Sequence, residues 1–519
     1  MFKNKYLIIK TLYIFILLST LSNSFLQAQP LPPKRELRGV WIATVANIDW
    51  PSQKNLSPAV QQQEFNFILD EHARNGMNAV FVQVRPVADA FYRSKYEPWS
   101  EWLTGKQGTE PNPPYDPLSF MIGESHKRGM EFHAWFNPYR ATFDTVSSRL
   151  SPTHISKQHP EWLLTYAGRK LFDPGLPQVR EYIVQVILDV VRNYDVDGIH
   201  FDDYFYPYPV AGDTLKDDST FIKYTDDFAS KDDWRRNNVN LLIQMVADSI
   251  KSVKPYVKFG VSPFGVWRNK ADDPGGSDTR AGQSSFTHLF ADSRLWIKHG
   301  WVDYILPQVY FSTRFGPVNY KKLTQWWATQ TYNRHIYIGH GPYKINKNAD
   351  STWFEPQEIP RQIRFNRNTP QVKGSVYFSS KSLMANPNHV QDSLRNDLYK
   401  FPALIPTMPW LDSIPPLAPI PEKTHKNRQG ITLHWHTPLK AIDGDTAYYY
   451  LIYRFNHKEN INLEDPGKLL AKLPSPVYSY TDNSVLSKKR YVYMITAVDR
   501  LHNESIAGKP VKVKAKKKK

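Results

Sequence analysis

The chain has 519 residues, of which 41% are hydrophobic and 22% charged, and it contains no cysteine. This length allows roughly two to four domains with a large buried core, so a wholly disordered chain is excluded. Without cysteine there is no disulfide framework, thiolate metal site or cysteine nucleophile, which leaves Asp, Glu, His, Ser and Tyr for catalysis. Aromatic residues reach 14%, and such rings stack on the apolar faces of sugars or bases.

The net charge of +17 is unevenly placed along the chain. Nine lysines lie near the two ends, within residues 3–10 and 512–519. The remaining charge is spread out, without an Arg-rich helix, a zinc finger or an RNA-binding signature, so we expect no nucleic-acid partner. A mildly basic surface that contacts the anionic polymers of a bacterial envelope is the plainer interpretation.

Residues 1–28 have the pattern of a signal peptide. A lysine-bearing start precedes an apolar stretch from Tyr6 to Leu18, a polar segment and the sequence Leu26-Gln27-Ala28. The apolar stretch is short for a membrane span, and no later segment approaches about 18 uninterrupted apolar residues. We therefore predict cleavage after Ala28 and a periplasmic or secreted protein with no transmembrane span. The alternative is an uncleaved leader that serves as a membrane anchor.

Between residues 35 and 400, β-rich runs alternate with segments of helical period such as Gln178–Tyr194. The eight runs are Leu37–Thr44, Asn78–Arg85, Met130–Asn137, Val196–Asp203, Lys258–Val266, Val302–Phe311, His335–Gly341 and Gly374–Ser380. Eight such units predict an α/β fold of the TIM-barrel type, (β/α)8. A doubly wound sheet is the alternative, but no glycine-rich phosphate loop follows the first run.

The composition changes after residue 400. Seven prolines within residues 402–421 predict a stiff, extended linker over residues 401–421. Residues 422–514 predict a small all-β sandwich, because strand runs alternate there with turn signals and no helical period is visible. The runs Leu433–Trp435, Tyr450–Arg454 and Tyr491–Asp499 resemble a fibronectin type III domain. We expect this domain to contact the cell wall or another protein, and residues 515–519 to form a solvated lysine tail.

Strand parity sorts the barrel side chains. Alternate residues of a strand point to opposite faces, and the side that faces the helices must be apolar. The residues placed in the interior by this rule are Gln83, Arg85, His133, Trp135, Asn137, His200, Asp202, Gln308, Tyr310, Tyr377 and Ser379. Active sites of such barrels lie at the C-terminal ends of the strands, so a polar, aromatic site is expected there.

Asp202 is the inward carboxylate near the C-terminal end of a strand. A cation such as Arg85 nearby would keep it ionised, which suits a nucleophile or a stabiliser of an oxocarbenium ion in glycoside hydrolysis. A structural acid that holds loops is the alternative. This chemistry also needs a proton donor. The loop candidates are Asp89, Glu101 and Asp203, followed by Glu97, Asp272, Asp273 and Asp278.

We expect neither a metal ion nor a cofactor in this protein. His133, His200 and His340 could converge, but the sequence has no H-x-x-x-H spacing, and none of these three histidines begins an H-x-E triplet. The sequence also lacks the G-x-S-x-G motif of serine hydrolases.

Several long motifs resemble, in the same order, the glycosyl-hydrolase-like family 10 barrel proteins over about residues 35–400. They are ELRGVW (Glu36–Trp41), PWS (Pro98–Ser100), LTG (Leu103–Gly105), HAWFNPYR (His133–Arg140), DGIHFDDYFYP (Asp197–Pro207), SPFGVWR (Ser262–Arg268) and PQVY (Pro307–Tyr310). The resemblance implies an exported envelope protein that cleaves peptidoglycan glycan strands, particularly strands without stem peptides.

The segment Asp197–Asp202 also looks like the fourth-strand motif of α-amylase-type barrels, whose final Asp is the nucleophile. Here His200 stands where those enzymes carry Arg, and the glutamate that they place after the fifth strand is absent. We therefore do not infer a retaining mechanism for this protein from the α-amylase-type barrels.

The resulting hypothesis is a glycoside hydrolase that acts on a polysaccharide of the bacterial cell wall. Asp202 is the main catalytic carboxylate, with Asp89, Glu101 or Asp203 as proton donor. The residues expected to bind sugar are Arg85, His133, Asn137, Arg140, His200, Gln308, Tyr310, Trp99 and Trp267, with Trp41, Trp102 and Trp135 as further stacking candidates. The alternative is a catalytically silent glycan-binding barrel, which would keep the aromatic cleft without paired carboxyl groups.

Overall fold

The computed structural model describes residues 32–146, 149–225 and 228–517. The predicted signal peptide and the last two residues of the predicted lysine tail lie outside these ranges. Residues 33–519 form one compact unit, so the domain boundaries drawn from the sequence stay predictions. Within the described ranges, no helix has both the length and the apolar character needed to cross a membrane.

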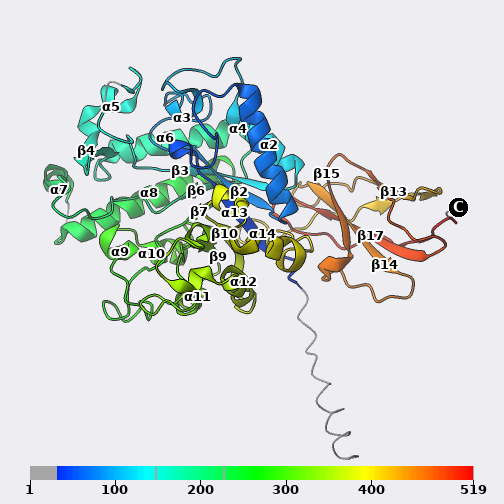
Figure 1. The fold of residues 1–519 in the computed structure, drawn as a ribbon. Helices are drawn as coiled ribbons and strands as arrows, with labels where there is room; N and C mark the ends of the chain where they lie inside the picture. Colours follow the sequence, from blue (N-terminus) through cyan, green and yellow to red (C-terminus); the bar gives the residue numbers. More distant parts are fainter. Residues whose placement is uncertain (1–31, 147–148, 226–227, 518–519) are drawn as a thin grey trace, which may run out of the picture. The chain divides into compact units, whose positions relative to one another are not determined.

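Eight parallel strands close into a barrel surrounded by helices (Figure 1), which confirms the predicted (β/α)8 fold. In order around the barrel the strands are β1 (Leu37–Ile42), β10 (Val372–Tyr377), β9 (His335–His340), β8 (Tyr304–Ile305), β7 (Lys258–Val261), β6 (Gly198–Phe201), β3 (Glu131–Phe136) and β2 (Ala79–Arg85). The principal outer helices are α2 (Pro58–Arg74), α4 (Pro117–Lys127), α6 (Pro177–Asn193), α8 (Lys231–Val253), α10 (Ser293–Lys298), α11 (Tyr320–Ala328) and α12 (Glu358–Arg367).

Shorter elements occupy the loops and the end of the barrel. They are α3 (Glu101–Thr104), α5 (Ile155–Gln158), the hairpin β4 (Leu163–Tyr166) and β5 (Arg169–Phe172), α7 (Asp218–Tyr224), α9 (Ser285–His288), α13 (Ser380–Met384) and α14 (Val390–Ser393). Local signals fix where helices begin. At α2, the Ser57 side chain accepts the N–H of Val60 and Pro58 occupies the first turn, because the first N–H groups of a helix have no partner within it.

The barrel interior confirms the parity rule for most strands. Trp41, Phe81, Trp135 and Tyr304 fill it together with smaller apolar residues, whereas Val80, Val82 and Val84 pack outward in the main core. The rule is wrong for Tyr377, which belongs to the outer core and shares a 2.7 Å hydrogen bond with the hydroxyl of Tyr399. Val376 faces inward instead. The Tyr377 hydroxyl can lie on the side that faces the helices because the Tyr399 hydroxyl is its hydrogen-bond partner there.

The sixth strand is shorter than predicted. The run Val302–Phe311 forms a strand, β8, only at Tyr304–Ile305. Pro307 has no N–H to donate to a neighbouring strand, and the chain beyond it makes isolated bridges from Gln308 to Phe264 and Gly339. The inward direction of Gln308 is retained through these bridges.

The C-terminal region is all β, as predicted, and consists of two antiparallel sheets. One sheet contains β11 (Ile420–Pro421), β12 (His425–Lys426), β13 (Ile431–His436) and β16 (Ser479–Asp482), and the other β15 (Leu469–Pro474), β14 (Tyr449–Asn456), β17 (Arg490–Val498) and β18 (Val511–Lys514). Trp435 is buried between them and packs on Tyr450. The fibronectin type III resemblance stays a prediction.

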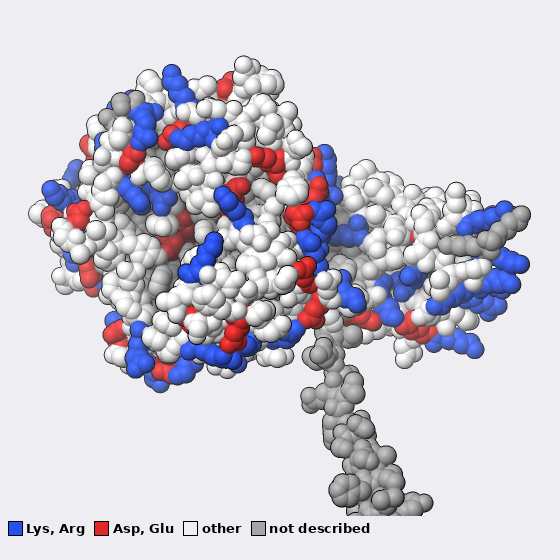
Figure 2. Space-filling view, in the orientation of Figure 1, with Lys and Arg blue, Asp and Glu red and all other residues white. Residues whose placement is uncertain are grey.

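The proline-rich segment packs against the N-terminal end of the barrel. Its residues Ile405 and Met408 join the cluster that fills the barrel interior, and the Trp410 indole donates to Asp303 over 2.9 Å. The β17–β18 turn region adds His502, whose Nε2 lies 2.6 Å from buried Glu131. Figure 2 shows Lys and Arg mixed with Asp and Glu over the barrel, and basic side chains predominating at the far end of the C-terminal sheets.

Candidate active site

A cavity of about 460 Å³ opens at the C-terminal ends of the barrel strands. Its walls come from segments that follow seven of the eight strands, together with Gln83 within β2, and barrel enzymes carry their catalytic groups at this end. The lining residues are Trp41, Ala43, Val45, Ile48, Gln83, Trp135, Asn137, Arg140, Asp202, Asp203, Tyr204, Tyr208, Ser262, Phe264, Gln308, Tyr310, Phe311, Tyr343, Lys344 and Phe378. The cavity therefore combines one pair of carboxyl groups with aromatic walls.

Asp202 accepts hydrogen bonds on both oxygens from N–H donors. Trp135 Nε1 donates to Oδ2 over 3.1 Å, and Asn137 Nδ2 donates to the same oxygen over 2.8 Å. The backbone N–H of Tyr204 donates to Oδ1 over 3.1 Å. These donors favour the ionised form, yet burial and the neighbouring Asp203 raise the pKa of Asp202 to about 7, against the opposing effect of Arg140.

Asp203 enters the same cavity from the next position in the chain. Gln308 Nε2 donates to its Oδ1 over 2.9 Å and also to the Ser262 carbonyl over 3.0 Å, and the Tyr208 hydroxyl bonds to Oδ2. Burial raises the pKa of Asp203, and its hydrogen bonds oppose that rise. Two buried, adjacent carboxyl groups titrate as a pair, so the site is able to hold one proton near neutral pH.

Arg140 and Lys344 are the basic residues that line this cavity, and Arg140 is the one that lowers the pKa of Asp202. Its guanidinium lies 4.4 Å from the centre of the Tyr204 ring, at the edge of the cavity. Aromatic rings form the opposite wall, where Tyr310 stacks on Phe378 at a centroid distance of 6.2 Å. Rings arranged in this way present flat apolar faces with polar edges, which match the two kinds of surface on a sugar.

His200 and His133 lie below the cavity and do not line it. His200 Nε2 accepts the Trp41 indole N–H over 3.3 Å, and its Nδ1 is 3.1 Å from the Tyr304 hydroxyl. Burial lowers the pKa of His200 well below its ordinary value, so the ring is neutral. His133 contacts the same Tyr304 hydroxyl and Glu131. Both histidines support the floor of the site rather than contacting a ligand.

Arg85 was expected in the site, but the structure places it behind the cavity wall. It pairs with Glu97, and both side chains are at most 1% exposed. The register between β2 and β3 shifts between Gln83 and Arg85, which removes Arg85 from the inward series. The guanidinium donates instead to the carbonyls of Asn137 and Pro138. Arg85 thus holds the segment that carries the Asn137 side chain.

The other proton-donor candidates also lie outside this cavity. Asp89 is buried and accepts from Gln107 over 3.3 Å, and burial raises its pKa to about 7. Glu101 pairs with Lys54. Glu97, Asp273 and Asp278 have cationic partners in Arg85, Arg268 and Lys322, and Asp272 is not among the lining residues. Of the predicted acids, only Asp203 is brought to Asp202.

Three of the predicted tryptophans, Trp99, Trp102 and Trp267, are likewise absent from the cavity. Trp267 is 5% exposed, donates to Asp292 and stacks on Trp326. Trp99 packs against the main core. Trp41 and Trp135 do line the cavity. Sequence reasoning did not assign roles to Tyr204, Tyr208 or Lys344, although the aromatic run that directly follows Asp203 was a signal for the two tyrosines.

Among the residues that the structure describes, one group of three acidic side chains is close enough to hold a metal ion, and none of its members lines this cavity.

A closed (β/α)8 barrel with adjacent carboxyl groups in an aromatic cavity is an arrangement typical of TIM-barrel glycosyl hydrolases. Residues 36–355 match the family described as Glycosyl hydrolase-like 10, and the chain belongs to this family. It is 48% identical over 480 residues to the glycosyl hydrolase YngK of Bacillus subtilis (strain 168), which covers 92% of this chain and 93% of YngK.

Two further comparisons give lower identities. The chain is 43% identical over 365 residues to the glycosyl hydrolase DigH of Escherichia coli (strain K12), a match that covers 66% of this chain and 82% of DigH. Among solved structures, the glycoside hydrolase domain of PgaB (BpsB) from Bordetella bronchiseptica aligns with a TM-score of 0.46 at 12% identity. It covers 70% of this chain and 99% of that domain.

Proposed function

We propose that this glycosidase cleaves a cell-wall glycan, namely peptidoglycan strands that lack stem peptides, in the periplasm or outside the cell. The observation that carries the reaction is the Asp202–Asp203 pair in one aromatic cavity. Hydrolysis of a glycosidic bond requires a proton for the leaving oxygen and a carboxylate for the positive charge that develops on the sugar ring.

The partners of the two carboxyl groups support different roles. All three groups that bond to Asp202 are N–H donors, so they favour its carboxylate form. Asp203 also accepts one N–H, from Gln308, but its other partner is the Tyr208 hydroxyl, whose oxygen can accept a hydrogen bond from a protonated carboxyl group. Asp203 is therefore the better proton donor, and Asp202 remains the carboxylate that faces the reacting carbon. In this scheme the raised pKa belongs to the pair.

The sugar would be held by the groups around this pair. Asn137, Arg140 and Gln308 offer donors at the cavity wall, and Tyr310 with Phe378 offers stacking surfaces. A stem peptide attached to the sugar would need room beside these rings, whereas a bare glycan strand would not. The preference for strands without peptides is therefore part of the proposal.

The C-terminal sheets would contact the anionic wall. Exposed Lys488, Lys489, Lys512 and Lys514 lie on or beside β17 and β18. Clustered cations of this kind attract anionic polymers in a salt-dependent way.

The test is the release of reducing ends by the wild-type protein from a panel of glycans. The panel contains peptidoglycan before and after amidase treatment, chitin oligosaccharides and a deacetylated glucosamine polymer. We expect release from amidase-treated peptidoglycan, at least about tenfold faster than from intact peptidoglycan. If reducing ends are released only from another glycan, the proposed substrate is wrong and the assignment as a glycosidase stands. Binding without release from any member would instead support the catalytically silent barrel.

A further inference from the structure

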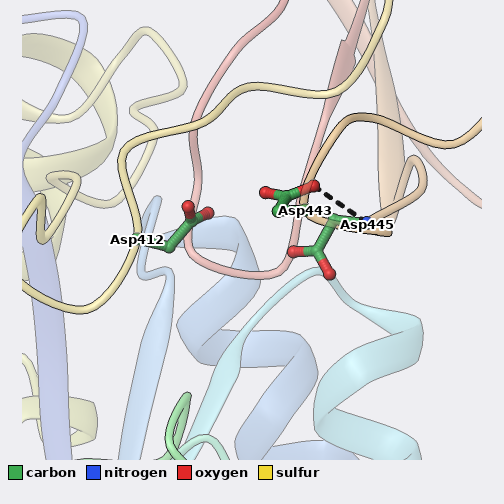
Figure 3. A group of neighbouring side chains, drawn as sticks. All are labelled: Asp412, Asp443 and Asp445. Atoms are coloured by element: carbon green, nitrogen blue, oxygen red, sulfur yellow. Dashed lines mark hydrogen bonds between the residues drawn. The ribbon is translucent and has the colours of Figure 1, made fainter.

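A second cluster of carboxyl groups lies outside the barrel cavity, where the segment after the barrel meets the C-terminal sheets (Figure 3). Asp412, Asp443 and Asp445 each place a carboxylate oxygen within 4.8 Å of the others. Asp412 comes from the proline-rich segment, and the other two come from the loop between β13 and β14. Residues far apart in the sequence thus bring negative charge to one place.

The loop is shaped to present both of its acids. Asp443 Oδ1 accepts the backbone N–H of Asp445 over 3.0 Å, as drawn in Figure 3. Gly444 between them has φ +91°, which L side chains rarely adopt. The Ala441 N–H bonds to the Asp445 carbonyl over 2.9 Å and closes the turn. The carboxylates of Asp443 and Asp445 are exposed, so nothing in the loop neutralises them.

A buried carboxyl group, that of Asp499, lies beside Asp412. Asp499 is 0% exposed, its Oδ1 accepts the N–H of Asn503 over 2.8 Å, and its Oδ2 has no hydrogen-bond partner. The Asp499 carboxyl group is within hydrogen-bonding reach of Asp412. A buried oxygen without a partner is costly, and here it adjoins an exposed acidic cluster.

Asn503 fixes the position of Asp412 relative to Asp499. Its Nδ2 donates to Asp412 Oδ2 over 2.8 Å, and its backbone N–H donates to Asp499 Oδ1. The Ile414 N–H donates to Asp412 Oδ1 over 2.9 Å. Every donor found here is a neutral N–H. Among the ion pairs of the described residues, none includes any of these four aspartates.

We propose that Asp412, Asp443 and Asp445, with Asp499 beside them, bind a calcium ion that fastens the segment after the barrel to the C-terminal sheets. Oxygen is the only ligand atom that these side chains offer, which selects hard cations over zinc or copper. Calcium accepts six to eight oxygens in irregular geometry, whereas magnesium demands a small, near-octahedral site. The bound ion would neutralise the cluster and give the Asp499 oxygen a positive neighbour. This revises the sequence expectation that the protein takes no metal.

Calorimetric titration of the chelator-treated full chain with calcium chloride tests the proposal. We expect one site per chain with a Kd on the order of 10⁻⁴ to 10⁻³ M, as in calcium-binding extracellular modules. Calcium at ten times this Kd should raise the Tm by roughly 1 to 3 °C. Magnesium at the same concentration should give a smaller shift. No heat up to about 10 mM calcium, or an equal effect of magnesium, would overturn the proposal.

Two sets of variants locate the ion. The Asp443→Asn, Asp445→Asn double variant should bind calcium at least about tenfold more weakly. Its matched control removes two exposed acids elsewhere, Asp232→Asn with Asp233→Asn at the start of α8, and should keep wild-type affinity. Unchanged affinity in the first variant would place the ion elsewhere and refute the site.

Asp499→Asn separates a metal site from a merely structural cluster. Without calcium, this variant should have a higher Tm than the wild type, because a repulsive buried charge is removed while the acceptor for Asn503 remains. Its calcium-induced rise in Tm should be reduced. A variant that is less stable without calcium and has a full calcium response would show that Asp499 has no part in the site.

Discussion

Asp202 and Asp203 are adjacent at the end of β6, and both carboxyl groups enter one cavity while accepting hydrogen bonds from different elements. Asp202 is held by Trp135 and Asn137 at the end of β3. Asp203 is held by Gln308, beyond β8, and by Tyr208. This arrangement gives two neighbours in sequence separate surroundings, which is the condition for an acid and a carboxylate to work side by side.

The pair should control the pH dependence of the reaction. Burial raises the pKa of both carboxyl groups, that of Asp202 to about 7, so the pair as a whole holds one proton at acidic pH and loses it as the pH rises past the neutral range. Because the donor must carry that proton, kcat/KM should fall about tenfold per pH unit above this range. The check is a pH–rate profile at fixed ionic strength. A rate that keeps rising to pH 9 would contradict a donor in this pair.

The Asn137→Ala variant should destabilise the ionised form of Asp202. The variant removes the 2.8 Å donor, so the pKa of the pair should rise and the alkaline limb of the profile should move to higher pH. We expect kcat to fall by about 10- to 100-fold. Asn193→Ala on α6 is the control, because it removes an amide that bonds only to Asp189. A lower affinity with an unmoved pH limb would assign Asn137 to sugar binding alone.

Glu97→Gln should destabilise the barrel. It leaves the Arg85 guanidinium buried without a counter-charge, and breaking such a pair costs about 3 kcal/mol in the free energy of unfolding. Glu101→Gln is the matched control from the same loop, since its pair with Lys54 is partly exposed and is worth less than about 1 kcal/mol. Urea unfolding measures both. Equal losses would contradict a structural role for Arg85.

Glu131→Gln should lower stability in a pH-dependent way. Buried Lys258 and His502 hold the pKa of Glu131 well below its ordinary value of 4.5, against the effect of burial. A lowered pKa contributes stability that is complete above pH 4.5 and is lost as the pH falls toward the folded-state value. The difference in unfolding free energy from wild type should therefore shrink below pH 4.5. A surface variant, Glu110→Gln, should show no such trend.

The sequence was sufficient for the barrel and for the centre of the site. The eight alternating units are visible in the local pattern of apolar and polar residues. The same pattern shows which side chains face inward, and it placed Gln83, Trp135, Asp202 and Gln308 correctly. The bulge that turns Arg85 away from the cavity is different in kind. It arises from the register between β2 and β3, which no pattern within one strand specifies.

Loop acids were the least predictable part of the site. Asp89 and Glu101 follow a strand that ends at the cavity, yet the loop folds them onto Gln107 and Lys54. Distance along the chain from a strand end does not fix the direction of a long loop. Asp203 was the reliable candidate because one peptide bond ties it to the strand that carries Asp202. The outward position of Tyr377 was also not predictable from its own strand, because it depends on a hydrogen bond to Tyr399 in a distant segment.

The most direct test compares hydrolysis by wild type, Asp202→Asn and Asp203→Asn on amidase-treated peptidoglycan, with glycan binding and folding measured on the same samples. Asp278→Asn, an exposed acid paired with Lys322, is the control. We expect both active-site variants to bind the glycan and to lose at least about 10²-fold in kcat, while the control keeps full activity. Full activity in either folded active-site variant would contradict catalysis by the Asp202–Asp203 pair.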